Sequence, residues 1–301
     1  MAVVLLVNPK SGRGLGVKLA TRFERSLRTA GVSCKRLDVP VGDFEASAAF
    51  DSDRFAGAEA LVVIGGDGTL SRAAVPAART HTPVYHVPVG NENLFAREFG
   101  MTRDPQALAV ALRRRDVVDT DMAHLDLGGE PTTFLIMAST GPDAGVVHRL
   151  DAGRGKAIGH LAYVGPSLAE FALPAVPRVT IEVDGERVVS AVRGWTVVAN
   201  ARPYGVGVDF ARHASPLSGR LDVVFMPCRT SAEAAWWMAR GRIGWHLRDK
   251  RLVYRSGRTV RVVPEGGRCP WQIDGEAVGG RRDRLVAELS VEPGGLRVLR
   301  P

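Results

Sequence analysis

Short apolar runs alternate with longer amphipathic stretches along roughly the first 120 residues. Leu19, Phe23 and Leu27 recur at helical spacing after the first apolar run. Strands separated by helices of this length indicate right-handed βαβ units and a parallel sheet. The predicted strands are Ala2–Val7, Ser33–Val39, Leu61–Ile64 and Val84–Val87, and further helices are predicted at Phe44–Phe55 and Leu70–Arg79.

The pattern changes near Asp121, and the rest of the chain is rich in β-forming runs. Asp184-Gly185 and Ser256-Gly257 separate such runs and are typical of hairpin turns. This half therefore predicts an antiparallel sheet or sandwich with two inserted helices, Ile158–Leu173 and Ala232–Leu247. Its predicted strands are Thr133–Met137, Arg178–Val183, Arg187–Val198, Leu221–Phe225, Arg251–Tyr254 and Thr259–Val263.

Composition narrows the class of protein. The 301 residues are long enough for two domains, and the formal net charge of +8 favours anionic partners without choosing among them. The three cysteines, Cys34, Cys228 and Cys269, are too scattered for a disulfide framework or a zinc site, which fits a reducing cytosol. No signal peptide and no apolar run of membrane-spanning length is recognisable.

The loop after the first strand, Asn8-Pro9-Lys10-Ser11-Gly12-Arg13-Gly14, combines small residues with two cations. Such a loop lets backbone N–H groups approach an anion at the start of a helix. The spacing Gly12-x-Gly14-x-Gly16 is similar to a dinucleotide fingerprint but lacks the G-x-G-x-x-G pattern. It is also not a Walker A loop, because no Gly-Lys-Ser/Thr follows at the required spacing.

The loop after the third strand, Gly65-Gly66-Asp67-Gly68-Thr69, leads straight into a helix. Three glycines in five residues predict a nest of amides for phosphate, and Thr69 is a candidate N-cap. Phosphates repel a carboxylate unless a cation bridges them, so Asp67 indicates Mg²⁺, held directly or through water. The simpler alternative is a tight strand-to-helix turn capped by Asp67.

Two further loops carry candidate chemistry. In Pro88-Val89-Gly90-Asn91-Glu92-Asn93, Asn91 or Asn93 is a candidate cap for a helix that begins near Leu94. Late in the chain, Asp274-Gly275-Glu276 places two carboxylates on one turn, where they can act as a general base and its orienting partner. On its own this tripeptide is first of all a hairpin turn. Asp184-Gly185-Glu186 has the same residues, and we interpret it as structural.

Together these motifs resemble the diacylglycerol kinase catalytic-domain family, which includes bacterial lipid kinases and sphingosine and ceramide kinases. The resemblance rests on four ordered motifs, with weaker similarity at Gly141-Pro142-Asp143-Ala144, from Lys156 to Tyr163 and over Ser215–Asp222. The four are Asn8-Pro9-x-Ser11-Gly12, the Gly-Gly-Asp-Gly-Thr loop, Pro88-x-Gly90-x-x-Asn93-x-x-Ala96 and Asp274-Gly275-Glu276.

The resemblance implies a doubly wound α/β nucleotide-binding domain, a β-rich antiparallel sandwich domain and an active site in the cleft between them. The C-terminal strand of the family returns to the first domain, so Leu296–Leu299 is expected to pair there. We therefore expect residues 1–122 and 292–301 to form the nucleotide domain, and residues 123–291 the lipid-substrate domain.

The family also implies ATP and Mg²⁺ and a role for each motif. Asp274 is the expected base for the lipid hydroxyl, Glu276 its orienting partner or a nucleotide contact, and Asp67 the Mg²⁺-network carboxylate and rival base. The expected nucleotide contacts are Asn8, Ser11, Gly12, Gly65, Gly66, Asp67, Gly68, Thr69, Asn91, Glu92 and Asn93.

Two positions depart from the family pattern. The usual Thr of the third motif is Asn91, which removes a hydroxyl near the phosphates and is expected to change nucleotide preference or rate. The usual Asp-Gly of a late loop is Ser218-Gly219, which argues against a structural cation held there by that carboxylate. Asp67 and Asp274 are both kept, so we expect an active enzyme.

The predicted helix Ala232–Leu247 carries Trp236, Trp237 and Trp245 beside several arginines. Indoles beside arginines suit a lipid headgroup interface, but an apolar helical stripe is more often core, and we favour the core interpretation.

The expected partners are ATP and a lipid (diacylglycerol, sphingosine or similar) at the membrane surface, and no nucleic acid is expected. The sequence does not decide whether the protein forms a homodimer. A lipid kinase of this kind belongs to phospholipid biosynthesis and is expected in the cytoplasm, peripheral on the inner face of the membrane. The alternatives are an NAD kinase, which shares the Gly-Gly-Asp-Gly loop, and a non-catalytic nucleotide- or lipid-binding protein. A Rossmann dehydrogenase comes last, because the third fingerprint glycine is missing.

Overall fold

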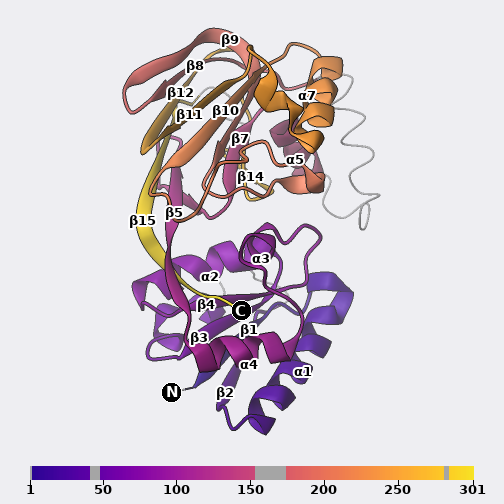
Figure 1. Cartoon of the computed structure of the whole chain (residues 1–301), viewed down its shortest axis with the longest axis vertical. Helices are drawn as coiled ribbons and strands as arrows, with labels where there is room; N and C mark the ends of the chain where they lie inside the picture. Colours follow the sequence, from indigo (N-terminus) through magenta and orange to yellow (C-terminus); the bar gives the residue numbers. More distant parts are fainter. Residues whose placement is uncertain (1, 41–47, 153–173, 281–284) are drawn as a thin grey trace. The chain divides into compact units, whose positions relative to one another are not determined.

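A computed structural model describes residues 2–40, 48–152, 174–280 and 285–301 of the chain (Figure 1). It divides into two compact units: unit 1 is Met1–Asp121 with Gly294–Pro301, and unit 2 is Met122–Pro293. The predicted helix Ile158–Leu173 and the Lys156–Tyr163 similarity lie outside the described residues, as does the first part of the predicted helix Phe44–Phe55.

Unit 1 is a parallel sheet with helices on both faces. Its strands lie in the order β2-β1-β3-β4-β15, and β1, β2, β3 and β4 pair in parallel with their neighbours. Every residue of β1 and β3 is buried, which is why both read as continuous apolar runs. The elements are β1 (Val3–Val7), α1 (Leu15–Thr29), β2 (Cys34–Asp38), β3 (Ala60–Gly65), α2 (Asp67–Arg79), β4 (Val84–Pro88), α3 (Leu94–Phe99) and α4 (Pro105–Arg114).

The helices of unit 1 cover the sheet through their apolar stripes. Helix α1 buries Leu19, Phe23 and Leu27, the residues that predicted it. Figure 1 shows α1 and α4 on one face of this sheet and α2 and α3 on the other. The doubly wound α/β arrangement is confirmed.

The segment between β2 and β3 differs from the prediction. The described part of Phe44–Phe55 forms two short 3₁₀ turns, Ala48–Phe50 and Ser52–Arg54, in place of a helix. The Asp51 side chain accepts a hydrogen bond from the Asp53 amide (3.2 Å), so Asp51 ends one turn and caps the next. A local side-chain bond of this type competes with helix continuation.

Unit 2 is built mainly from antiparallel strands. Strand β9 is long: it pairs with β8 along its first half and with β7 and β10 along its second, while β8 pairs with β12. The elements are β5 (Val117–Asp126), β6 (Thr132–Phe134), β7 (Met137–Thr140), α5 (Pro142–Ala152), β8 (Arg178–Val183), β9 (Glu186–Ala199), β10 (Leu221–Pro227), α7 (Ser231–Ile243), β11 (Val253–Gly257), β12 (Thr259–Gly266), β13 (Trp271–Ile273), β14 (Glu276–Val278) and β15 (Ala287–Leu299).

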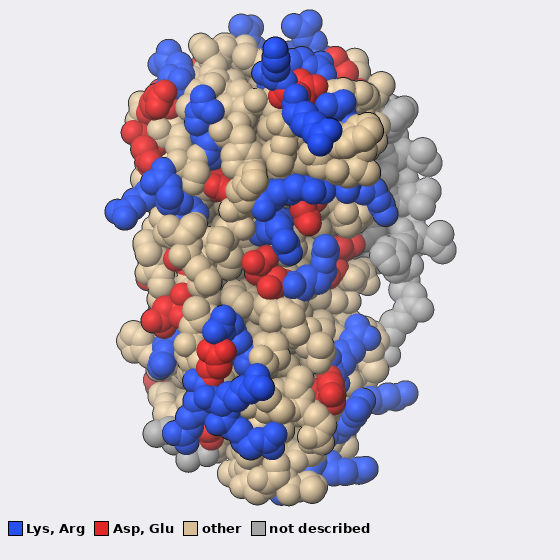
Figure 2. Space-filling view, in the orientation of Figure 1, with Lys and Arg blue, Asp and Glu red and all other residues tan. Residues whose placement is uncertain are grey.

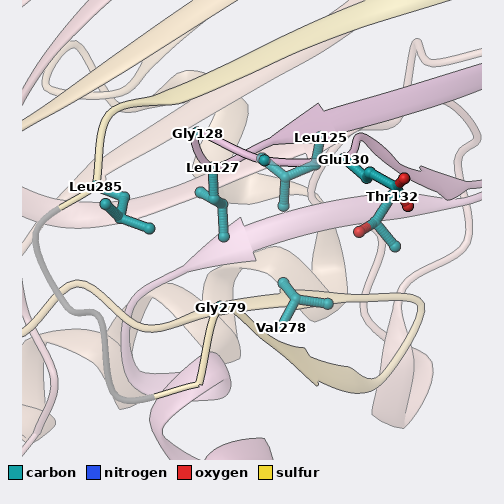
Figure 3. A pocket seen from close by; sticks show the side chains of 9 residues that line it. Leu125, Leu127, Gly128, Glu130, Thr132, Val278, Gly279 and Leu285 are labelled. Carbon is teal, nitrogen blue, oxygen red and sulfur yellow. The ribbon is translucent and has the colours of Figure 1, made fainter.

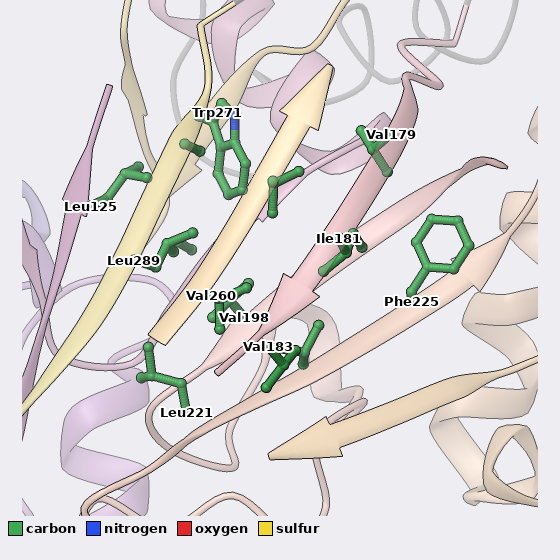
Figure 4. Packing of buried hydrophobic residues seen from close by; sticks show 14 of the residues in the cluster. Leu125, Val179, Ile181, Val183, Val198, Leu221, Phe225, Val260, Trp271 and Leu289 are labelled. Atoms are coloured by element: carbon green, nitrogen blue, oxygen red, sulfur yellow. The ribbon is translucent and has the colours of Figure 1, made fainter. Parts of the chain in front are cut away.

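The core of unit 2 lies among these strands, where alternate residues of each strand turn inward. Figure 4 shows Val179, Ile181 and Val183 of β8 in the same cluster as Val198, Phe225 and Trp271 from other strands. All six are at most 6 % exposed. The predicted β-rich second domain is confirmed.

Two predicted hairpin turns have different outcomes. Asp184-Gly185 joins β8 to β9 with positive φ at both residues (48° and 82°), which is the two-residue turn expected of Asp-Gly. Ser256-Gly257 does not make a hairpin, because β11 pairs with β10 whereas β12 pairs with β8 and β15. Gly257 is needed for close packing instead: a Cβ there would lie 2.3 Å from Cγ1 of Val183.

The C-terminal strand completes the sheet of unit 1, as predicted for Leu296–Leu299. Strand β15 pairs with β12 over Ala287–Ser290, and Val298 then pairs in parallel with Val84 of β4. The buried Thr120 hydroxyl donates to the Leu296 carbonyl (3.0 Å) and fixes this end of β15. Among the described helices, none has the length and apolar character needed to cross a bilayer.

Candidate functional site

The loop that follows β1 is tied to the loop that follows β3 through Asn8. The Asn8 amide N–H donates to the Ile64 carbonyl (3.0 Å), and its side-chain Nδ2 donates to Oγ1 of Thr69 (2.9 Å). Asn8 Oδ1 accepts from the Lys10 amide (3.0 Å), which turns the chain toward α1. Asn8 therefore holds two of the predicted phosphate loops together.

Glycines bring the loop after β4 against the other two. A Cβ on Gly12 would lie 2.6 Å from Cγ1 of Val89, and a Cβ on Gly90 would lie 2.9 Å from the Gly66 Cα. Below 3 Å the neighbouring atoms must shift to admit a Cβ, and Gly12 also has a φ of 59°, so both positions favour glycine. The three loops at the carboxyl ends of β1, β3 and β4 thus touch one another, at the edge of the sheet where α/β proteins bind ligands.

Helix α2 begins directly in this group of loops. Its N-cap is Gly66, with extended backbone and no side-chain cap, and Asp67 and Gly68 form its first turn. The first N–H groups of a helix have no partner within it, so they are available to an anion such as a phosphate. The expectation that Thr69 caps the helix is wrong: Thr69 lies inside the first turn, is buried, and receives the Asn8 side chain.

The Asp67 carboxylate caps a different helix. Its two oxygens accept from the Leu94 amide (2.9 Å) and the Phe95 amide (3.2 Å), at the start of α3. Burial raises the pKa of Asp67, and the backbone hydrogen bonds act in the opposite direction. A buried carboxylate held by two amides is fixed in position, and its remaining lone pairs can hold a water of a hydrated cation.

Neither Asn91 nor Asn93 caps α3 through its side chain. Asn93 occupies the N-cap position in the left-handed region (φ 49°) and bonds back to Gly90, accepting from its amide (2.8 Å) and donating to its carbonyl (2.7 Å). Asn91 is exposed, and Glu92 lies 3.9 Å from the guanidinium of Arg97. Asp67, 27 residues earlier in the chain, takes the capping role.

In unit 2, Asp274 forms a hairpin turn and also binds a distant segment. It lies between β13 and β14 with φ 46°, followed by Gly275 at 87°. Its carboxylate accepts from the amides of Leu135 (2.8 Å), Ile136 (3.0 Å) and Met137 (3.0 Å). These bonds explain why the predicted strand Thr133–Met137 is divided into β6 and β7. The amides between the two strands donate to the Asp274 side chain and not to a neighbouring strand.

A second carboxylate, Asp143, lies in a polar cluster next to this turn. It accepts hydrogen bonds from the hydroxyl groups of Ser139 and Tyr204 (2.6 Å for Tyr204) and from the Gln272 side-chain amide (3.3 Å). Gln272 also accepts from the Gly275 amide (2.8 Å). Burial raises the pKa of Asp143, and burial together with the Asp143 charge raises the pKa of Tyr204 well above its ordinary value.

This cluster was missed as a site by sequence reasoning. Asp143 was noted only as part of a weak similarity, and a tyrosine 61 residues away gave no local signal of contact.

Two further positions singled out in the sequence, Glu276 and Ser218, also lie in unit 2. Glu276 is exposed at the first position of β14. The Ser218 hydroxyl donates to the Arg220 carbonyl (3.0 Å) and accepts from the Arg220 amide (3.2 Å), which makes a local turn. Among the described residues, no three His, Cys, Asp or Glu side chains gather as a metal site.

A hollow of about 290 Å³ lies between β5, β6 and β14 of unit 2. Figure 3 shows Leu125, Leu127 and Val278 pointing toward the same space, with Leu285 beside them. Gly128, Gly129, Glu130, Thr132 and Gly279 form the rest of its lining.

Comparison with known proteins agrees with these features. Residues 2–125 match the model of the diacylglycerol kinase catalytic domain, and residues 136–300 match the YegS C-terminal NAD kinase beta sandwich-like domain. A protein of Mycobacterium tuberculosis named "Diacylglycerol kinase" is 30 % identical over 307 residues, covering 99 % of this chain and 95 % of that protein. The chain belongs to the diacylglycerol kinase family of lipid kinases.

Other members and structures of this kind are similar along most of the chain. A Pseudomonas aeruginosa protein named "Probable lipid kinase YegS-like" is 29 % identical over 265 residues, or 82 % of this chain and 78 % of its own. A diacylglycerol kinase structure from Bacillus anthracis has a TM-score of 0.69 at 15 % identity, covering 100 % of this chain and 97 % of the other. Yeast NADH kinase complexed with NADH has a TM-score of 0.53 at 12 % identity, covering 100 % and 84 %. At these identities the two structures show a common fold.

Membership in the diacylglycerol kinase family confirms the resemblance and the prediction of a phosphotransferase. The roles of single residues stay predictions. Unit 1 gathers the expected nucleotide contacts on three touching loops, whereas Asp274 and Glu276 belong to unit 2. The gathered residues are Asn8, Ser11, Gly12, Gly65, Gly66, Asp67, Gly68, Thr69, Asn91, Glu92 and Asn93.

Proposed function

We propose that this protein transfers the γ-phosphoryl group of ATP, in the presence of Mg²⁺, to a hydroxyl group of a diacylglycerol-type lipid. The nucleotide half of the proposal is supported by the group of three touching loops in unit 1. The lipid half is supported by the full-length similarity to a protein named diacylglycerol kinase.

The proposed nucleotide site uses backbone groups more than charged side chains. The glycines of the three loops let the backbone approach the phosphates, and the N-terminus of α2 supplies N–H donors and the positive end of its dipole. Mg²⁺, when bound, neutralises phosphate charge. Asp67 would hold it through water, because Asp67 already accepts from two amides of α3. Phosphoryl transfer depends mainly on such positioning and charge neutralisation.

The proposed base is Asp274. In the reaction, the lipid oxygen forms a bond to the γ-phosphorus, the bond to the β–γ bridging oxygen breaks, and ADP leaves. Asp274 takes the proton of the lipid hydroxyl. Three amides fix the orientation of its carboxylate, so the base approaches the hydroxyl in one geometry. Asp67 is the rival for this role, and Glu276 is proposed to orient the base or contact the nucleotide.

The test is phosphoryl transfer from ATP that carries a radioactive γ-phosphate, with Mg²⁺, to diacylglycerol, ceramide, sphingosine and NAD in parallel. We expect label in an organic-extractable lipid product, and loss of that label with EDTA. Asp274→Asn should lose activity, whereas Asp184→Asn should keep it, because Asp184 lies in a hairpin turn of the same kind.

Other outcomes would contradict the proposal. Label in NADP and in no lipid would assign the protein as an NAD kinase, whose fold it shares. Nucleotide binding without transfer to any acceptor would indicate a binding protein. Full activity of Asp274→Asn, with loss of activity in Asp67→Asn, would move the base to Asp67.

A further inference from the structure

Helix α7 has large apolar residues on its outer face as well as on its inner face. Ala234, Trp237 and Gly241 are buried, and the Trp237 indole N–H donates to the Pro227 carbonyl (2.9 Å). Trp236 and Ile243 are seven residues apart and lie on the opposite side of the helix, where their side chains are 38 % and 55 % exposed. Two large apolar side chains therefore lie on the solvent side of α7, where they are accessible to a partner.

Trp245 follows the end of the helix, and its carbonyl accepts a hydrogen bond (3.0 Å) from the Arg240 guanidinium that lies over the Trp236 ring. The helix ends at Gly244, which adopts φ 78°, and a Cβ there would lie 2.5 Å from the Arg212 guanidinium. This turn leads into a 3₁₀ segment, Trp245–Arg248, in which Trp245 is 52 % exposed. We call Trp236, Ile243 and Trp245, with the cations around them, the α7 face.

The α7 face is cationic. Residues 231–251 contain five Lys or Arg and two acids. The guanidinium groups of Arg240 and Arg251 lie over the Trp236 ring, 4.5 Å and 4.8 Å from its centre. Figure 2 shows Lys and Arg side chains gathered over the region where Figure 1 draws α7.

The two acids of this segment are already engaged. Glu233 accepts from the Thr230 amide in the capping box at the start of α7, and Asp249 pairs with Arg251. Within the described chain, no acid pairs with Arg242, Arg248 or Lys250, which are exposed. Three exposed cations of this segment therefore have no anionic partner among the described residues.

We propose that the α7 face docks this protein on an anionic lipid bilayer. Indole rings favour the boundary between headgroups and acyl chains, and each Lys or Arg near an anionic membrane strengthens binding about fivefold. The charge of the face complements anionic phospholipids and not a neutral surface. The biological meaning of the docking rests on the proposed lipid kinase function, but the docking itself requires no catalysis.

The test is cosedimentation with vesicles of phosphatidylcholine alone and of phosphatidylcholine with phosphatidylglycerol, without ATP or acceptor lipid. We expect wild-type protein to bind the anionic vesicles and to be released by salt. The double variant Trp236→Ser, Trp245→Ser should bind at least tenfold more weakly while it remains folded by circular dichroism at the assay temperature. Leu217→Ser is the matched control, because Leu217 is 53 % exposed but lies outside the α7 face.

Charge reversal is an independent second test. Arg242→Glu with Arg248→Glu should weaken binding to anionic vesicles by more than tenfold and reduce its salt dependence. Equal binding by wild type and both double variants, or no binding by wild type, would overturn the proposal. A wild-type dimer that becomes a monomer in the Trp236→Ser, Trp245→Ser variant would also overturn it, because the face would then bind a second copy.

The two proposals fail separately. A protein that binds anionic vesicles through the α7 face but phosphorylates no lipid would refute the kinase function and keep the docking surface. A protein that phosphorylates lipid in a bilayer, and whose α7-face variants match wild type in both vesicle binding and rate on that bilayer, would keep the kinase function and refute the docking surface. With a short-chain acceptor dispersed in water, the variants should keep the wild-type rate.

Discussion

Replacing Asp274 with asparagine changes one oxygen of a buried side chain into an amide nitrogen and removes its charge. Oδ1 accepts from Ile136 and Met137, and Oδ2 accepts from Leu135. An asparagine can keep the two bonds of Oδ1, but its nitrogen then faces the Leu135 N–H, which is also a donor. The reverse orientation loses two bonds instead of one.

The cost follows from these bonds. A hydrogen bond to a charged group contributes about 1.5–3 kcal/mol, and an unsatisfied buried donor costs about 1–3 kcal/mol. The two retained bonds also become neutral and weaker. We therefore expect Asp274→Asn to lower the free energy of unfolding of unit 2 by about 2–4 kcal/mol. For a unit of this size the melting temperature should fall by roughly 5–15 °C.

Tryptophan fluorescence measures this change selectively. All five tryptophans lie within Met122–Pro293, so their emission during urea or thermal unfolding reports unit 2. The matched control is Asp184→Asn, which has the same turn geometry (φ 48° against 46°). Its Oδ1 accepts both amide bonds, from Arg258 and Thr259, so asparagine keeps them. The exposed Asp184–Arg220 ion pair is lost, which costs below about 1 kcal/mol, and the bonds that become neutral are exposed to water, unlike those of Asp274.

Equal stability of the two variants would refute the argument that three amides hold Asp274. The same experiment defines the temperature at which Asp274→Asn is still folded. Its kinase activity should be measured below that temperature, so that loss of activity reports on chemistry and not on unfolding.

Three more predictions address other parts of the chain. Burial lowers the pKa of His86 from 6.5 to about 4, so the stability that neutral His86 contributes is present above pH 6.5 and is lost as pH falls toward 4. The loss in free energy of unfolding is roughly 3 kcal/mol. Unfolding followed by circular dichroism at the two pH values should show this loss in wild type but not in His86→Gln. Gly90→Ala places a methyl group 2.9 Å from the Gly66 Cα and should weaken nucleotide binding at least tenfold, whereas Gly129→Ala, with open space around it, should not; equal affinities by calorimetry would contradict the contact. Trp237→Ala should cost about 3–5 kcal/mol in urea unfolding, because Trp237 is 1 % exposed, and a cost below 1 kcal/mol would show that it is not core.

The sequence predicted those parts of the site that depend on neighbouring residues. Gly65 to Thr69 follow a fully buried strand, and the apolar run together with its glycines placed the loop at the edge of a parallel sheet. The same local logic predicted the Asp184-Gly185 hairpin. Where the turn chemistry and the apolar period agreed, the structure followed the prediction.

The features of the candidate site that the sequence did not predict depend on contacts between distant residues. Asp67 was expected among phosphate-binding amides, but its carboxylate is held by α3, 27 residues away. Asp274 binds amides 137 to 139 residues earlier, and that contact divides a run that reads as one strand. Trp236 and Trp237 are adjacent, and only the packing of α7 shows that one is exposed and the other is core. A single sequence contains no signal for which distant groups meet.

The return of β15 to unit 1 has a consequence for the order in which the chain folds during synthesis. The β4 edge of the first sheet pairs with Val298, 214 residues after Val84. The 172 residues of unit 2 are made in between, which takes roughly 10–30 s at usual elongation rates. During that interval the nascent unit 1 has an uncovered β4 edge, which is open to wrong pairing. The nucleotide-binding unit, although translated first, is completed last.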